Sequence, residues 1–220
     1  MATITSYDSL LDTFGQYVDR ADLQGYMPNF VQMAESRFNR LLRTRDMEVA
    51  STNAVDATAT FSLPADYLEW IAAYWTPAGG DGPSRRLGLR YVEGDSPEAR
   101  YRHRPSGDPQ YFTILAGQIN LVPARAGSCS FVYYQKIPAL GPSQQTNWLI
   151  TRAPELYLYA VLSEAMAFQR DEERAAGWMK MAEERLQAFL SEGDSQKVAR
   201  RADRRALTDA AEVTAKNLPV

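Results

Sequence analysis

The side chains best able to do chemistry in this sequence are few. His103 is the only histidine, and the cations of Arg102 and Arg104 on either side disfavour its protonated form. With no cysteine or second histidine near it, His103 does not suggest a transition-metal site. Cys129 has no histidine base at a recognisable spacing, and its strand-like context favours a small buried side chain over a nucleophile.

Paired carboxylates are the other candidates for proton transfer. Glu172–Glu173 and Glu183–Glu184 fall in a segment with helical periodicity, which favours the solvated face of a helix over a glycosidase pair. The sequence has no phosphate-binding glycine loop, dinucleotide fingerprint, zinc-protease helix or nucleophile elbow. We therefore predict that the protein is not an enzyme and uses no cofactor and no metal. An unfamiliar hydrolase of cell-wall or capsule polymer stays open, although no particular carboxylate stands out for it.

Two groups of basic residues point to binding instead. If the segment after residue 193 is helical, five cations share one stripe at spacings i, i+3, i+4, i+7 and i+8, namely Lys197, Arg200, Arg201, Arg204 and Arg205. The second group lies in the irregular, glycine- and proline-rich segment 79–107, and its candidate contact residues are Arg85, Arg86, Arg100 and Arg102. For the first group, docking into an acidic groove of a protein partner, a merely solubilising tail and DNA contact stay open.

Composition limits the classes of protein to consider. A chain of 220 residues with 45% hydrophobic residues can build a substantial core, and one cysteine excludes an internal disulfide. A net charge of -3 argues against wrapping nucleic acid with the whole surface, because phosphate binding depends on Lys and Arg. There is no signal peptide and no run of about 18 apolar residues, so we expect neither secretion nor a membrane partner.

Hydrophobic periodicity predicts two helices at the N-terminus. A capping box of Thr5 and Asp8 starts a helix over about 6–20, and Pro28 starts a second. The second helix places apolar residues on one face, and the residues assigned to its other face are Glu35, Arg37, Arg40 and Arg43. This charged face is either a solvated surface or a subunit contact.

Helical periodicity returns near Pro154 and again after Asp171, a good N-cap. Between the two helical regions the period changes to two, which predicts strands at 57–63, 68–76, 87–92, 111–115, 118–122 and 130–137. Ala116–Gly117 is the expected turn of a hairpin.

These elements predict an α+β fold. It consists of an antiparallel helical bundle from the N- and C-terminal segments, an inserted small antiparallel β-sheet domain and an extended C-terminal tail. The predicted boundaries are 1–46 for the N-terminal helices, 47–147 for the β domain, 148–192 for the C-terminal helices and 193–220 for a basic tail that docks to a partner.

Short signatures occur in order along most of the chain. They are Leu63–Glu69, Ile119–Ala124, Tyr133–Leu140, Asn147–Leu149 and Ala153–Tyr159. With them, and with its N-terminal helix pair and residues 175–190, the chain resembles the head-to-tail adaptors of short-tailed bacteriophages, also called connectors, gatekeepers or tail tubular protein A. The segment beyond about Gly193 is not matched.

The resemblance implies a structural virion protein of the neck or tail, synthesised in the host cytoplasm. It implies a homo-oligomeric dodecameric ring between the portal protein and the tail nozzle protein, which supports tail fibres and lines the channel through which DNA passes without specific binding. On this view the tail cations bind the portal, and Arg85, Arg86, Arg100 and Arg102 meet a neighbouring subunit or tail protein. The alternative is a nucleic-acid-binding module that uses the same basic groups.

Overall fold

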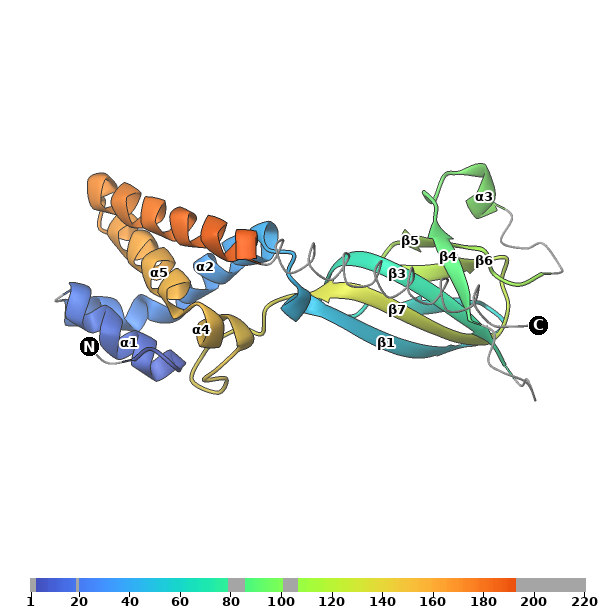
Figure 1. Cartoon of the computed structure of the whole chain (residues 1–220), viewed down its shortest axis with the longest axis horizontal. Coiled ribbons are helices and arrows are strands. Elements are labelled where there is room, and N and C mark those ends of the chain that lie inside the picture. Colours follow the sequence, from blue (N-terminus) through green and yellow to red (C-terminus); the bar gives the residue numbers. More distant parts are fainter. Residues whose placement is uncertain (1–2, 19, 79–85, 101–106, 193–220) are drawn as a thin grey trace, which may run out of the picture. The chain divides into compact units, whose positions relative to one another are not determined.

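The computed structural model describes residues 3–18, 20–78, 86–100 and 107–192 (Figure 1). The chain divides into two compact units. Met1–Arg45 and Ile137–Val220 together make the helical unit, and Asp46–Lys136 makes the β unit.

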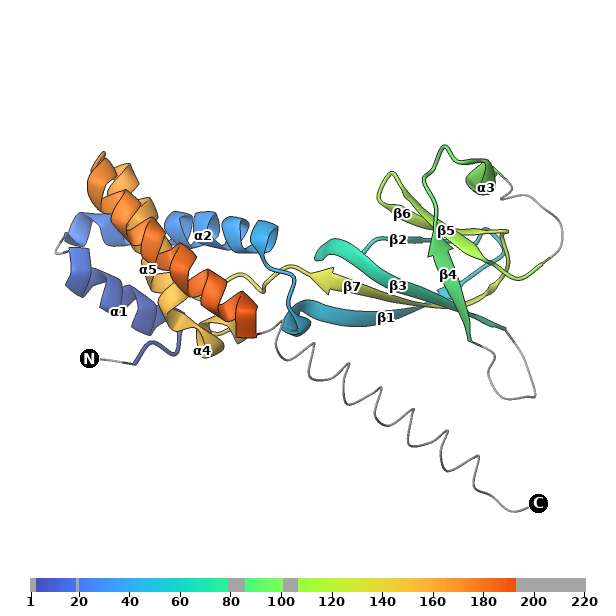
Figure 2. The same cartoon turned by 45° about the horizontal axis from the view of Figure 1, so that its top comes forward.

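The helical unit is organised around α5. Its elements are α1 (Tyr7–Val18), η1 (Ala21–Tyr26), α2 (Met27–Leu41), α4 (Trp148–Arg152), α5 (Pro154–Phe168) and a helix that the structure describes over residues 172–192. Buried residues occur on every side of α5, so other helices must surround it. Both α1 and α2 pack against α5 (Figure 2), and Ser163 of α5 donates a hydrogen bond of 3.1 Å to the carbonyl of Ala175 in the following helix.

Local hydrogen bonds explain where two of these helices begin. The backbone N–H of Ser9 donates to Ser6 Oγ at 3.2 Å, and the N–H of Ser6 donates to Ser9 Oγ at 2.8 Å. This reciprocal capping box shows that the predicted box of Thr5 and Asp8 is wrong in register. The carboxylate of Asp171 accepts from the N–H of Arg174 at 3.1 Å, which confirms Asp171 as an N-cap.

A buried polar network ties α2 to later parts of the helical unit. The Glu35 side chain is only 6% exposed, and its Oε1 accepts hydrogen bonds from the Leu140 N–H at 2.8 Å and the Tyr157 hydroxyl at 3.1 Å. Asn147 Nδ2 donates to the same hydroxyl at 2.7 Å. The assignment of Glu35 to the charged face of α2 is therefore wrong, since it lies one turn after buried Val31. Burial raises the pKa of Glu35.

The β unit contains one sheet of seven strands among its described residues, in the order β1-β7-β3-β4-β5-β6-β2. They are β1 (Glu48–Val55), β2 (Thr60–Ser62), β3 (Tyr67–Pro77), β4 (Leu87–Tyr91), β5 (Tyr111–Leu115), β6 (Gln118–Val122) and β7 (Gly127–Gln135), with the short helices η2 (Arg45–Met47) and α3 (Pro97–Arg100). The edge strands β1 and β2 contact each other, so the curved sheet is nearly closed (Figures 1 and 2).

The predicted fold, a small antiparallel sheet inserted in a helical bundle, is wrong. The sheet is large, and it is mixed because β4 and β5 pair in parallel, with Arg90 opposite Tyr111. Residues 92–110 join these two strands and include α3, and only a connection of such length permits a parallel pair. The predicted strand 57–63 shortens to β2, and the eight-residue β1 precedes it. The predicted extended tail at 193–220 lies outside the described residues.

The core of the β unit is aromatic. Trp75, Phe112 and Phe131 are fully buried, and the rings of Phe112 and Phe131 meet edge to face at 6.2 Å. A Cβ at Gly127 would lie 2.5 Å from both Thr76 O and Trp75 Nε1, so the close approach of β3 and the indole to β7 requires glycine there. The Ala116–Gly117 turn is confirmed, because both residues have positive φ between β5 and β6.

Candidate interaction surfaces

Arg86 is the one predicted contact residue whose side chain the structure describes. Arg100 ends α3. The other predicted contact residues lie outside the described residues, as does His103; they are Arg85, Arg102, Lys197, Arg200, Arg201, Arg204 and Arg205. The two groups of cations therefore remain predictions.

The Arg86 side chain lies flat on the sheet. Its guanidinium carbon is 3.8 Å from the centroid of the Tyr74 ring, and Nη2 is 3.4 Å from Ser130 Oγ. Tyr74 and Ser130 are cross-strand neighbours in β3 and β7. Stacking on the Tyr74 ring fixes the position of the Arg86 charge. Because Arg86 stays exposed, its N–H groups can still donate to a carboxylate of a partner.

Arg86 lies on a surface that we call the outer β face. Its uncharged residues alternate with less exposed neighbours along β1, β3 and β7: Ala50, Thr52, Ala54, Ala72, Tyr74, Thr76, Ser128, Ser130 and Val132. The same face continues at Glu48 and Glu69, which both pair with Tyr134 of β7. Small uncharged side chains let another protein surface approach closely without desolvating an ion. The uncharged part of the outer β face therefore suits a protein contact in which Arg86, stacked on Tyr74, supplies a positive charge.

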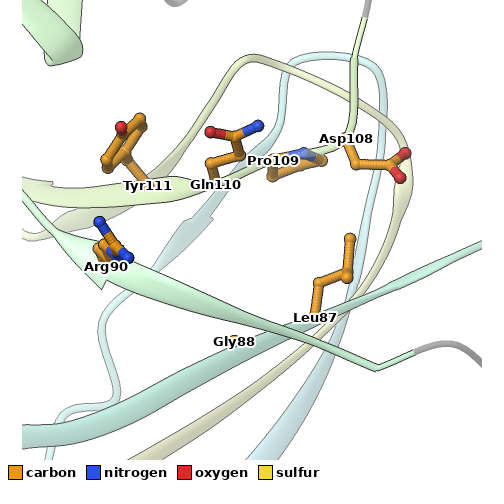
Figure 3. Close-up of a pocket in the computed structure, with 7 residues that line it drawn as sticks. All are labelled: Leu87, Gly88, Arg90, Asp108, Pro109, Gln110 and Tyr111. Atoms are coloured by element: carbon orange, nitrogen blue, oxygen red, sulfur yellow. The ribbon is translucent and has the colours of Figure 1, made fainter.

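A pocket of about 430 Å³ opens where β4 and the chain leading into β5 diverge (Figure 3). Its lining comes from Leu87, Gly88, Arg90, Asp108, Pro109, Gln110 and Tyr111. The Asp108 carboxylate forms an ion pair with Arg125, whose guanidinium lies 5.6 Å from the Trp75 ring centroid. Among the described residues the lining contains neither a thiol nor a histidine, and it is largely polar.

A second hollow, of about 290 Å³, lies on the helical unit along α2. It is lined by Gln32, Met33, Ser36, Arg37, Arg40 and Glu164. Arg37 is partly buried, and its Nη2 is 2.7 Å from Glu164 Oε1 on α5. Arg40 is exposed. The predicted charged face of α2 thus separates into buried Glu35, ion-paired Arg37 and exposed Arg40.

Cys129 is a buried part of the β-unit core. Its side chain has no exposed surface, which confirms the prediction of a small buried residue. Burial raises the pKa of the thiol to about 12, and a hydrogen bond with the backbone of Tyr74 offsets this rise only in part.

We expect Cys129 to be unreactive in the folded protein. At pH 8 a water-soluble disulfide reagent should label it slowly, because both access and thiolate formation require unfolding. Absorbance of the released thiol, followed with and without guanidinium chloride, measures this. Complete labelling of the folded protein within seconds would contradict the buried assignment.

Other features of the described residues bear on function class. Across residues 3–18, 20–78, 86–100 and 107–192, no group of three or more His, Cys, Asp or Glu side chains could hold a metal ion. In the same ranges no helix is both long and apolar enough to cross a membrane. Glu172, Glu173, Glu183 and Glu184 are all exposed, as expected for the solvated face of a helix.

Comparison with known protein families gives one match. The family model of the SU10 adaptor protein matches residues 5–209. The chain belongs to the SU10 adaptor protein family. No curated protein matches it. The resemblance to phage adaptors is thereby confirmed at the level of the adaptor family.

Membership of the SU10 adaptor protein family makes the chain a phage adaptor, a structural virion component that interacts with other head or tail proteins.

Two ion pairs of this SU10 family member could not be predicted from its sequence. Arg37 and Glu164 are 127 positions apart, and no local spacing links Arg125 to Asp108. Glu35 did carry a signal, since it follows Val31 and precedes Phe38 at helical spacing.

Proposed function

We propose that this adaptor is a head-to-tail connector of a short-tailed phage, similar to tail tubular protein A. On this proposal it forms a dodecameric ring between the portal protein and the tail nozzle, supports tail fibres and lines the DNA channel. The observation that carries the proposal is the family match over nearly the whole chain. The mild net negative charge is compatible with a channel along which DNA slides.

Separate surfaces are available for the separate partners that such a connector needs. The tail cations, Lys197, Arg200, Arg201, Arg204 and Arg205, are assigned to the portal. Arg86 on the outer β face, together with Arg85, Arg100 and Arg102, is assigned to a neighbouring subunit or tail protein. Residues 193–220 are the docking tail in this proposal, and the rest of the helical unit together with the β unit supplies the ring.

The test is sedimentation of the purified adaptor with the portal ring encoded by the same genome. We expect a saturable complex with about one adaptor per portal subunit. Replacing Arg200, Arg201 and Arg204 with glutamine should weaken binding about tenfold or more at moderate salt, because each loses a charge-assisted contact. The matched control replaces Arg174, Lys180 and Arg185, three exposed cations at 172–192, and should bind normally.

Each other outcome has a clear meaning. Absence of binding to a well-formed portal would contradict the connector role. Equal loss in both triple variants would show that net charge, not the tail, governs binding. Steeply salt-dependent binding to DNA without binding to the portal would instead favour the nucleic-acid-binding module.

A further inference from the structure

The exposed stripe of α2 is open to a partner. It consists of Asn29, Gln32, Met33, Ser36 and Arg40, which share one side of the helix. The hollow of about 290 Å³ lies along this stripe, and Met33 is 47% exposed beside it. An exposed methionine next to a polar hollow is a surface that gains apolar contact when a partner covers it.

The α2 stripe has an unbalanced positive charge. Glu35 is the only carboxylate of α2 and is buried in its own network. Glu164 at the hollow is paired with Arg37. Arg40 has no ion-pair partner among the described residues. Arg40, the Gln32 amide and the Ser36 hydroxyl together offer hydrogen-bond donors to an acidic side chain.

The exposed stripe of α1 has the opposite character. Asp8, Asp12 and Gln16 follow one another at i, i+4 and i+8 and are all exposed, and α1 contains no basic residue. Two carboxylates one turn apart repel each other, and neither has an ion-pair partner within the described residues. A cation from outside the subunit would relieve that repulsion.

We propose that the α1 stripe of one copy of this chain binds the α2 stripe of the next copy, with Asp12 opposite Arg40. This inference rests on the ring proposed above. A closed ring needs two different and complementary patches on each subunit, and these stripes lie on separate helices that both pack against α5 (Figure 2). At 1.5 Å per residue the α1 stripe is about 12 Å long and the α2 stripe about 17 Å, so the α1 stripe can lie along the α2 stripe over its whole length.

The acidic residues of the helix at 172–192 are a poorer match for α2. Glu172, Glu173, Glu183 and Glu184 share that helix with Arg174, Lys180 and Arg185, so its surface is of mixed sign. The α1 stripe carries carboxylates and no cation, so charge complementarity favours α1 of a second copy over the helix at 172–192.

Charge reversal tests the proposal. We expect Arg40→Glu and Asp12→Arg each to reduce assembly of the adaptor on its portal at least about tenfold, because each sets like charges against each other. The double variant should recover assembly to within about threefold of the unchanged protein, because the ion pair is re-formed with its direction reversed. Sedimentation velocity measures the number of copies bound per portal ring.

Controls separate this inference from the function that it rests on. Arg185→Glu makes the same charge change on another exposed helix surface and should leave assembly unchanged. Thermal unfolding verifies that each variant is folded. If the unchanged adaptor assembles on the portal and both single reversals also do, the α1–α2 contact is wrong while the connector role stands. If the unchanged adaptor does not assemble at all, the ring and this contact both fail.

Discussion

Replacing Trp75 with alanine is expected to lower the free energy of unfolding of the β unit by about 3–5 kcal/mol. Trp75 is completely buried, and its indole N–H has no hydrogen-bond partner among the described residues. The expected loss of stability therefore comes from lost packing, because the substitution leaves a cavity beside Gly127. Guanidinium denaturation followed by far-UV circular dichroism measures the change.

A second tryptophan provides the matched control. Trp70 is 36% exposed and stacks on the Tyr91 ring at 5.2 Å, so its replacement with alanine should cost clearly less than that of Trp75. Gly127→Ala should also destabilise the β unit, because its new methyl group would collide with Thr76 and Trp75. Equal losses of unfolding free energy in Trp75→Ala and Trp70→Ala would contradict the buried position of Trp75 in the core.

The second large effect is expected at Glu35. Glu35→Ala should destabilise the helical unit by about 2–5 kcal/mol, because the Leu140 N–H and the Tyr157 hydroxyl lose their acceptor in a buried place. Arg40→Ala, a truncation on the exposed side of the same helix, should change stability by at most about 0.5 kcal/mol. Thermal unfolding followed by circular dichroism compares the two variants. If Glu35→Ala left the stability unchanged, the buried network would contribute nothing to it.

The pH dependence of stability gives Glu35 an independent readout. Its pKa in the folded protein is above the ordinary value of 4.5, because burial disfavours the carboxylate. The folded state therefore binds the proton more tightly than the unfolded state. The stabilisation from this proton is complete below pH 4.5 and is lost as the pH rises through the folded pKa.

Glu35→Gln isolates that contribution. Its amide oxygen can still accept both hydrogen bonds, but it does not titrate. We expect the stability of this variant relative to the unchanged protein to increase from pH 4.5 towards neutral pH. A constant difference across that range would mean that the Glu35 pKa is not raised.

The sequence by itself determined the features that depend on near neighbours. Apolar residues at helical spacing predict the α2 and α5 helices. Asp171 is recognisable as an N-cap because short polar side chains are preferred at helix starts. The Ala116–Gly117 turn is recognisable because a tight hairpin requires residues with backbone freedom. The adaptor family also followed from short signatures in order along the chain, and the match over residues 5–209 bears it out.

Tertiary structure decided whatever depends on distant residues. The parallel pair of β4 and β5 is chosen by how the sheet closes, because an alternating pattern predicts a strand but not its neighbour. Arg86 meets Tyr74 and Ser130 only because β3 and β7 pair in that register. Glu35 shows the same limit. The sequence placed it on the charged face of the second helix, whereas its burial depends on the hydrogen bonds that Leu140 and Tyr157 donate from distant parts of the chain.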